Sequence, residues 1–371
     1  MARFHALPVA AVDRLTDDSV TLTFTVPPAL RAEFRHTPGQ HLALRRTVDG
    51  REIRRTYSIC SPAPADETEG PETLRVGVRL VDGGAFSTYA LKEIAAGDEI
   101  EVMTPAGRFT LDPAPGLYAA VVGGSGITPV LSIVATLLSR EPRARFCLVR
   151  SDRTSASTMF LEEVADLKDR FPERFQLVTV LSREEQQAGL PSGRLDETRL
   201  TGLLPALLPV DRVAGWFLCG PFGLVQQAER SLRGLGVPRS RIHEEIFHVD
   251  ASPTTTDTTT TTDTTAAATT AASTAMTATM AATVTARLDG RGGTWSVREG
   301  EALLDAVLRN RSDAPYACKG GVCGTCRAFL VSGEVRMNRN FALEPEETEA
   351  GYVLACQSHP VTTEVELDFD R

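Results

Sequence analysis

Four cysteines in the C-terminal part of the chain constrain its fold more than any other feature. They are Cys318, Cys323, Cys326 and Cys356. Their pattern, C-x4-C-x2-C-x29-C, is the thiolate spacing of a plant-type 2Fe-2S cluster. Glycines between the first three permit tight turns, because glycine accepts positive φ angles. The spacing therefore predicts a cluster-binding loop whose fourth ligand comes from a distant strand.

Two alternatives remain for these thiols: a zinc site, and structural or disulfide-bonded cysteines. Zinc commonly takes two C-x2-C pairs or histidine partners, and disulfides suit small secreted chains. The six histidines are scattered without ligand spacing, so we assign none of them to a metal. Four thiols at this spacing complete the ligand set of a cluster, which we therefore predict. A one-electron carrier in so long a chain also needs a source of electrons.

The composition limits the classes of partner. A length of 371 residues predicts two or three domains, and 42% hydrophobic residues indicate globular ones. The net charge of -9 argues against nucleic acid or an anionic membrane surface. The longest apolar runs, 130–138 and 202–210, are too short to cross a membrane, and the first residues show no apolar signal region. The other three cysteines occur singly, which suits a reducing cytoplasm.

One change of composition divides the chain. Residues 251–282 are almost entirely Thr, Ala and Ser and have no repeating apolar face, which predicts a flexible linker. Residues 1–113 contain short alternating strands, such as 20–26 and 74–80, which predict a small antiparallel barrel. Residues 114–250 alternate apolar strands with helices, for example a strand at 175–181, which predicts a doubly wound parallel sheet. Residues 283–371 form the cysteine-rich domain.

Two Gly-rich turns follow apolar strands of the predicted parallel sheet. The turn 123–129 has three glycines that permit close approach to a pyrophosphate, with Thr128 as N-cap and Pro129 in the first helical position. An ordinary strand-to-helix turn would look similar, since the G-x-G-x-x-G fingerprint is absent. Cys219-Gly220-Pro221 ends another strand in the same way. Two such turns at carboxyl ends of strands predict a dinucleotide site.

The predicted barrel carries a second set of polar residues. Arg54-Arg55-Thr56-Tyr57-Ser58 closes one strand, and the loop 83–87 opens a helix. An arginine near a helix N-terminus can clamp a pyrophosphate, and Tyr57 with Ser58 can stack on and hydrogen-bond a flat polar ring. Taken separately, these residues would equally suit a solvated arginine and a core tyrosine.

Together these features resemble the ferredoxin–NADP reductase superfamily. Its flavin signature is similar to Arg55-Thr56-Tyr57-Ser58, its pyrophosphate loop to Gly84-Ala85-Phe86-Ser87, and its nicotinamide turns to 124–129 and 219–223. Segments such as 38–42, 315–323 and 351–354 resemble more closely the reductase subunits of phenylacetyl-CoA epoxidases. This resemblance implies an antiparallel FAD-binding β-barrel, a doubly wound nicotinamide-binding domain and a C-terminal β-grasp ferredoxin domain. The linker is longer than the resemblance implies.

The resemblance also implies roles for individual residues. Ser58 is expected near the flavin N5, Cys219 near the nicotinamide and Phe247 near the flavin ring, as the residues closest to the reacting atoms. The remaining FAD contacts are expected from Arg55, Thr56, Tyr57, Gly84, Phe86 and Ser87. The remaining nicotinamide contacts are expected from Gly124, Gly126, Thr128, Arg153, Ser182, Arg183, Gly220 and Pro221.

The choice of nicotinamide depends on three side chains. Asp152 ends the second strand, where an acid can bind a free ribose 2′-OH, as in NADH. Arg153 and the pair Ser182-Arg183 suit the 2′-phosphate of NADPH. Because two cationic side chains stand against one carboxylate, we predict NADPH. The alternatives are that the site binds NADH, or that all three side chains only form ion pairs on the surface.

The resemblance implies an electron path from NADPH through FAD and the cluster to a di-iron oxygenase. The alternatives are the NADH-dependent reductase of a ring-hydroxylating or alkane hydroxylase system and, in another class, a redox-sensing module. The acidic run 344–349 and the acidic residues of 364–370 predict a ferredoxin face that meets a basic partner surface.

Overall fold

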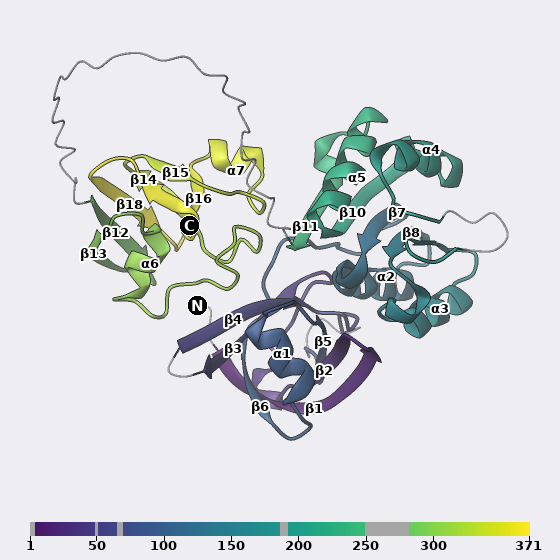
Figure 1. Cartoon of the computed structure of the whole chain (residues 1–371), viewed down its shortest axis with the longest axis horizontal. Coiled ribbons are helices and arrows are strands. Elements are labelled where there is room, and N and C mark those ends of the chain that lie inside the picture. The colour runs from purple at the N-terminus through teal and green to yellow at the C-terminus, as the bar shows by residue number, and fades with distance from the viewer. Residues whose placement is uncertain (1–3, 49–50, 65–69, 186–191, 249–281) are drawn as a thin grey trace, which may run out of the picture.

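The computed structural model describes residues 4–48, 51–64, 70–185, 192–248 and 282–371. The predicted linker, residues 251–282, lies outside the described residues except for Ala282, where a strand begins. The described residues form three units, each with its own sheet (Figure 1).

The first unit is an antiparallel barrel. Its strands follow the order β4-β3-β6-β1-β2-β5, and an isolated bridge between Ile59 and Val76 connects the two edges. Alternating apolar residues such as Leu22, Phe24 and Leu44 fill the interior, as period-two alternation predicts. The elements are β1 (Phe4–Thr16), β2 (Ser19–Thr25), η1 (Pro28–Leu30), β3 (His41–Val48), β4 (Arg51–Ser58), β5 (Thr73–Arg79), α1 (Ala85–Lys92) and β6 (Glu99–Met103).

The second unit is a parallel sheet of order β11-β10-β7-β8-β9 between two layers of helices. Ala120 and Val122 pack towards α2 and α3, whereas Ala119 and Val121 pack towards α4 and α5. The strand order reverses between β7 and β10, where doubly wound sheets bind ligands. The elements are β7 (Gly116–Gly123), η2 (Gly124–Gly126), α2 (Ile127–Arg140), β8 (Ala144–Asp152), η3 (Ser155–Ser157), α3 (Leu161–Arg170), β9 (Phe175–Leu181), α4 (Glu197–Leu207), η4 (Val210–Arg212), β10 (Val213–Pro221), α5 (Phe222–Gly234), η5 (Arg239–Arg241) and β11 (Ile242–His248).

The third unit is a mixed sheet of order β13-β12-β18-β14-β16 that packs against helix α6. Strands β12 and β18 are parallel and the other pairs antiparallel. The elements are β12 (Ala282–Leu288), β13 (Arg291–Val297), α6 (Leu303–Leu308), β14 (Arg327–Ser332), β15 (Val335–Met337), α7 (Pro345–Glu349), β16 (Tyr352–Leu354), β17 (Ser358–Pro360) and β18 (Glu364–Asp368). The barrel, the doubly wound sheet and the β-grasp ferredoxin fold predicted from the sequence are confirmed.

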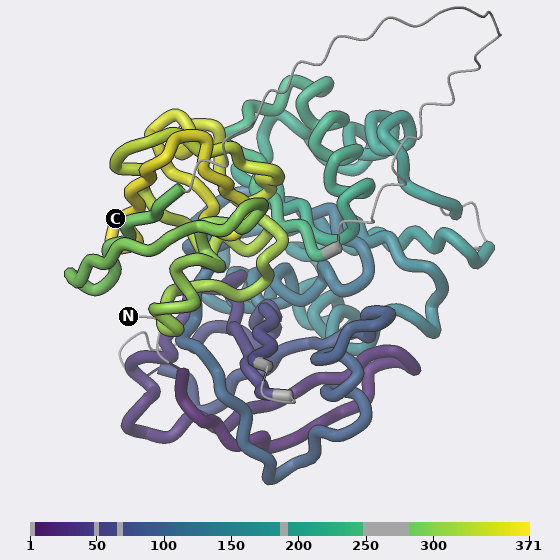
Figure 2. Tube along the Cα trace, turned by 60° about the vertical axis from the view of Figure 1, so that its left-hand side comes forward, coloured from purple at the N-terminus to yellow at the C-terminus, as the bar shows by residue number. Residues whose placement is uncertain are grey.

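The third unit contacts both of the others. Figure 2 shows it, in green to yellow, beside the barrel and the α/β unit. Phe222 of α5 makes an edge-to-face contact with Phe341, with 5.3 Å between ring centroids. Ala317, next to the first of the four cysteines, packs against Ala43 and Met103 of the barrel. The cysteine loop therefore lies where the three units meet.

Candidate functional site

The structure brings the four predicted cluster ligands together as two pairs of thiols. Cys318 is hydrogen-bonded to Cys323, and Cys326 to Cys356. The hydrogen bond from the Cys323 thiol lowers the pKa of the Cys318 thiol to about 5, and hydrogen bonds from backbone amides act in the same direction. All seven cysteines are free of disulfides. Two thiols for each of two metal atoms is the arrangement that a 2Fe-2S cluster requires.

The backbone of this loop supports the thiols that would bind the cluster. In the described ranges, no three His, Cys, Asp or Glu side chains are arranged to hold one metal ion. The amide of Gly320 donates to the Cys318 sulfur over 3.3 Å, as an amide would to a thiolate ligand. Gly321 has φ +78°, and a Cβ there would lie 3.0 Å from the Arg339 carbonyl oxygen. A side chain at this position would therefore strain the loop.

The two predicted nicotinamide turns meet at the carboxyl ends of β7 and β10. A Cβ on Gly126 would lie 2.2 Å from the Cys219 carbonyl oxygen, and one on Gly220 would lie 2.7 Å from the Gly123 carbonyl oxygen. Gly220 also has φ +141°. Backbone contact this close requires glycine on both turns. The backbone of both turns therefore lies at the same point of the sheet, where the strand order reverses between β7 and β10.

The predicted cap of α2 was wrong. The helix begins at Ile127 with Gly126 as N-cap, so Thr128 and Pro129 are its second and third residues. The Thr128 side chain is buried, and its hydroxyl donates to the Ser125 carbonyl over 2.9 Å. The three-residue helix η2 displaces the cap, because it continues directly into α2. The hydroxyl of Thr128 is thus already bonded within the turn.

A carboxylate joins the barrel to the α/β unit beside two of the predicted residues. The Ser58 hydroxyl donates to Glu245 Oε2 over 3.2 Å, and the Cys219 sulfur lies 4.0 Å from the same oxygen. His41 Nδ1 lies 3.8 Å from Glu245 Oε1. Burial, and next the Glu245 charge, raise the pKa of Cys219 well above its ordinary value, which keeps this residue a neutral thiol.

Glu245 was not among the residues that the sequence singled out. Strands β10 and β11 are parallel, with Cys219 in register with Glu245. The sequence feature that could have marked it is the pair Glu244-Glu245, which stands between apolar residues in the last strand of the α/β unit. Phe247, which was predicted, lies two residues further along β11 and packs half-buried on the same apolar cluster as Cys219.

Strand β4 and the start of α1 come together through aromatic contact. The Tyr57 and Phe86 ring centroids are 5.6 Å apart, and burial raises the pKa of the Tyr57 phenol. Arg55 is exposed and donates from Nη1 to the Arg54 carbonyl over 2.7 Å. Thr56, between Arg55 and Tyr57, is half-buried.

The loop before α1 is built around Ser87. Its hydroxyl accepts from the Val81 amide over 3.1 Å and donates to the Gly84 carbonyl over 3.0 Å. A Cβ on Gly84 would lie 2.6 Å from this hydroxyl. The first amides of α1, at residues 85–87, have no partner within the helix and suit a phosphate. These donors, the exposed Arg55 and the Tyr57 ring fit FAD.

The edge beyond β8 and β9 differs from the sequence-based expectation in one respect. Asp152 is buried, and its Oδ2 accepts a 2.8 Å ion-paired hydrogen bond from Arg150 Nε, so it does not face the edge as a free acid. Arg153 and Arg183 are exposed, and the Arg183 amide donates to the Arg153 carbonyl over 2.9 Å. Neither guanidinium makes an ion pair with a residue that the structure describes. Ser182, half-buried, precedes Arg183.

Fold and site together define a class: modular oxidoreductases with an FAD barrel, a nicotinamide-nucleotide domain and a 2Fe-2S domain. The chain matches the family "Oxidoreductase FAD-binding domain" over residues 6–111, "Oxidoreductase NAD-binding domain" over 121–230, and "2Fe-2S iron-sulfur cluster binding domain" over 286–361. Phthalate dioxygenase reductase is a similar solved structure, with TM-score 0.58 and 23% identity over 99% of this chain and 98% of that chain.

Two curated relatives span almost the whole chain. One is a component of the 1,2-phenylacetyl-CoA epoxidase of Escherichia coli (strain K12), which is 41% identical over 100% of this chain and 99% of its own length. The ferredoxin reductase component of 3-ketosteroid-9-alpha-monooxygenase from Rhodococcus rhodochrous is 32% identical over 99% of this chain and 97% of its own length. The chain belongs to the phenylacetyl-CoA epoxidase reductase family of the ferredoxin–NADP reductase superfamily. It is an NAD(P)H-dependent flavin iron–sulfur oxidoreductase. No helix within the described ranges is long and apolar enough to span a membrane.

Proposed function

We propose that the chain is the NADPH-dependent reductase component of a phenylacetyl-CoA epoxidase, whose di-iron oxygenase component takes electrons from the cluster. The observation that carries this proposal is the 41% identity to the Escherichia coli epoxidase component over the full length of both chains. Bound FAD would supply the conversion of a two-electron hydride into the single electrons that a 2Fe-2S cluster carries.

The preference for NADPH is supported by the edge of the parallel sheet. The exposed guanidinium groups of Arg153 and Arg183 come from adjacent strand ends and are free for a 2′-phosphate. Asp152, the residue that favoured NADH, is instead buried against Arg150. A 2′-phosphate at this edge would therefore face the guanidinium groups of Arg153 and Arg183, and the Asp152 carboxylate, paired with Arg150, would not repel it.

The residues of the site have distinct proposed tasks. Arg55 and the first amides of α1 hold the FAD pyrophosphate, and Tyr57 stacks on the flavin ring. Ser58 would lie beside the flavin N5 and Cys219 beside the nicotinamide, and Glu245 holds the Ser58 hydroxyl in place. Gly126 and Gly220 let the two turns pack closely against each other, so that the backbone of both can face the nicotinamide nucleotide. Phe247 covers the flavin ring.

The test uses the purified protein with FAD and cluster, and a phenylacetyl-CoA oxygenase component. We expect NADPH-dependent epoxidation of phenylacetyl-CoA that requires this chain, with NADH at least about tenfold less efficient. The proposal fails if this oxygenase receives no electrons although NADPH reduces both flavin and cluster.

The relation to a 3-ketosteroid monooxygenase reductase favours one other candidate, the reductase of a different oxygenase. The alternative of this kind predicted from the sequence uses NADH. In that case the same preparation would show higher kcat/KM with NADH, and the phenylacetyl-CoA oxygenase would stay oxidised.

A further inference from the structure

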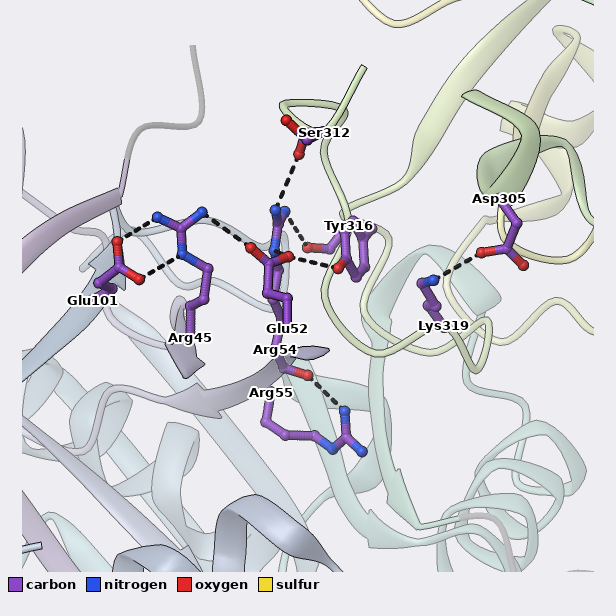
Figure 3. A network of polar contacts seen from close by, with 9 residues as sticks. All are labelled: Arg45, Glu52, Arg54, Arg55, Glu101, Asp305, Ser312, Tyr316 and Lys319. Atoms are coloured by element: carbon purple, nitrogen blue, oxygen red, sulfur yellow. Dashed lines mark hydrogen bonds and ion pairs between the residues drawn. The ribbon is translucent and has the colours of Figure 1, made fainter. Parts of the chain in front are cut away.

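One arginine is buried between the ferredoxin unit and the barrel. Arg54 lies on β4, and only 4% of it is exposed. Its Nη2 donates to the Ser312 carbonyl over 3.2 Å and its Nη1 to the Tyr316 carbonyl over 3.5 Å (Figure 3). Both acceptors belong to the segment that leads into Cys318. Arg54 therefore holds the backbone just before the first cluster ligand.

The same guanidinium is satisfied on its other sides. Its Nε donates to Glu52 over 2.6 Å, and its carbon lies 4.1 Å from the centroid of the Tyr316 ring and 4.9 Å from that of Phe4. The Tyr316 hydroxyl donates to the same Glu52 oxygen over 2.7 Å. Because Arg45 also binds Glu52, over 3.2 Å, this carboxylate is fixed from the barrel side (Figure 3). A buried charge that is bonded in this way tolerates little displacement.

An apolar patch beside Arg54 carries the cluster loop itself. Ala317 is buried against Ala43 and Met103 of the barrel, and Cys323 packs on the edge of this patch. The contact between the units therefore has an arginine–tyrosine centre, which is the usual composition of an energetically dominant contact.

Strand β4 connects this contact to the flavin and nicotinamide side. Side chains on a strand alternate between its two faces, so Arg54 and Ser58 lie on the same face. Four residues of extended chain separate them by about 13 Å. One rigid strand thus carries the contact with the cluster loop at one position and the proposed flavin-facing hydroxyl at another.

Other polar contacts between the units lie further out and are more exposed. Arg108 of the barrel pairs with Glu347 of α7, and its side chain is 52% exposed. Arg239 pairs with Glu344 over 2.8 Å. Exposed ion pairs of this kind contribute little. They also engage two carboxylates of the acidic run that was expected to meet a separate partner.

We propose that Arg54 is a positioning residue that docks the ferredoxin unit on strand β4, and so sets the rate at which electrons pass from the flavin to the cluster. The chemistry is unchanged: one electron leaves the reduced flavin and one arrives at the cluster. Arg54 touches neither group and acts through the backbone of residues 312–316.

The test compares Arg54→Ala with two charge-matched controls in the full-length protein that carries FAD and cluster. Arg108→Ala removes an outer contact of the same interface, and Arg14→Ala removes an exposed barrel arginine whose Nη2 donates to the Asp17 carbonyl. The first measurement is hydrogen–deuterium exchange of residues 312–317 in the oxidised protein. The second is anaerobic stopped-flow absorbance, which separates reduction of the flavin by NADPH from reduction of the cluster.

We expect Arg54→Ala to speed exchange at 312–317 and to slow flavin-to-cluster transfer, each by about tenfold, because arginine and tyrosine at the centre of a contact dominate its energy. Flavin reduction, and both measurements in the two controls, should stay within about twofold. If Arg54→Ala misfolds, Tyr316→Phe provides the second variant: it removes only the hydroxyl bond to Glu52 and should slow transfer about threefold, roughly 0.6 kcal/mol.

Three results would overturn the proposal. Unchanged exchange and transfer in a folded Arg54→Ala protein would show that this contact does not dock the unit. Faster hydrogen–deuterium exchange at residues 312–317 with an unchanged rate of flavin-to-cluster electron transfer would show that docking at Arg54 does not limit that rate. Equal losses in Arg54→Ala and Arg108→Ala would show that charge, and not this position, matters.

Discussion

The Ser58 hydroxyl donates a 3.2 Å hydrogen bond to the carboxylate of Glu245, which joins strand β4 of the barrel to strand β11 of the α/β unit. The Cys219 sulfur lies 4.0 Å from the same carboxylate oxygen. Ser58, proposed beside the flavin N5, and Cys219, proposed beside the nicotinamide, thus contact the same side chain. Glu245 is thus one of the side chains that connect the barrel to the α/β unit.

Ser58→Ala should slow reduction of the flavin by about tenfold at saturating NADPH. The reason is that the variant removes the hydroxyl expected beside the flavin N5 and leaves Glu245 Oε2 without its bond from Ser58. Tenfold in rate corresponds to about 1.4 kcal/mol. Stopped-flow loss of flavin absorbance measures this step. Ser139→Ala, which removes an exposed hydroxyl on α2 that bonds the Ala135 carbonyl, serves as the control. Equal rates in both variants would contradict the proposed role of Ser58.

Arg183→Ala and Arg153→Ala should each raise the KM for NADPH by about tenfold and leave the KM for NADH unchanged. Each guanidinium can make charge-assisted hydrogen bonds to a 2′-phosphate, a group that NADH lacks. Steady-state dye reduction with both nucleotides measures the effect, and Arg143→Ala, at an exposed arginine of the same unit, is the control. An equal rise for NADH would place these arginines outside a 2′-phosphate site.

Asp152→Ala should lower the free energy of unfolding by about 3–5 kcal/mol, because it leaves the Arg150 cation buried without its partner. The ratio of kcat/KM for NADPH and NADH should change less than twofold. Urea unfolding followed by circular dichroism measures the first quantity, and the double variant Arg150→Met/Asp152→Leu should recover much of the loss. A stable Asp152→Ala protein with altered nucleotide preference would mean that this acid binds the ribose.

His36 should make the barrel less stable in mild acid. Burial lowers its pKa from 6.5 to about 4. The unfolded chain therefore binds more protons between these two pH values, and stability falls as the pH drops through this range. Between pH 7 and pH 5 this group alone accounts for about 2 kcal/mol. His36→Gln should reduce the difference in urea stability between these pH values by that amount, with flavin fluorescence as the signal; an unchanged difference would contradict the assignment.

Much of the fold could be predicted because periodicity and turn residues are local. The strand predicted at 175–181 has the same bounds as β9, and the strand predicted at 20–26 is β2, shifted by one residue. The cap of α2 could not be placed, because a short 3-10 helix and a true N-cap have similar Gly-rich sequences. Thr128 was assigned the cap for that reason.

The candidate site divides in the same way. The four cysteines could be found because their spacing alone marks them, and the two Gly-rich turns because each follows an apolar strand. Glu245 and Arg54 could not, since their importance comes from partners 187 and 258 positions away, Ser58 and Ser312. The ion pair of Asp152 could not be predicted, because its sequence position gave no sign that Arg150, two residues earlier on the same strand face, would bury and pair it.

The most direct test of the electron path is an anaerobic titration with NADPH of the protein loaded with FAD and cluster, beside a Cys323→Ser variant. We predict that NADPH bleaches both flavin and cluster bands in the unaltered chain. In Cys323→Ser, which lacks one cluster ligand, it should bleach the flavin alone, with dye reduction retained. A fully loaded protein that accepts no electrons from NADPH or NADH, or a folded variant that loses flavin reduction together with the cluster, would contradict the account.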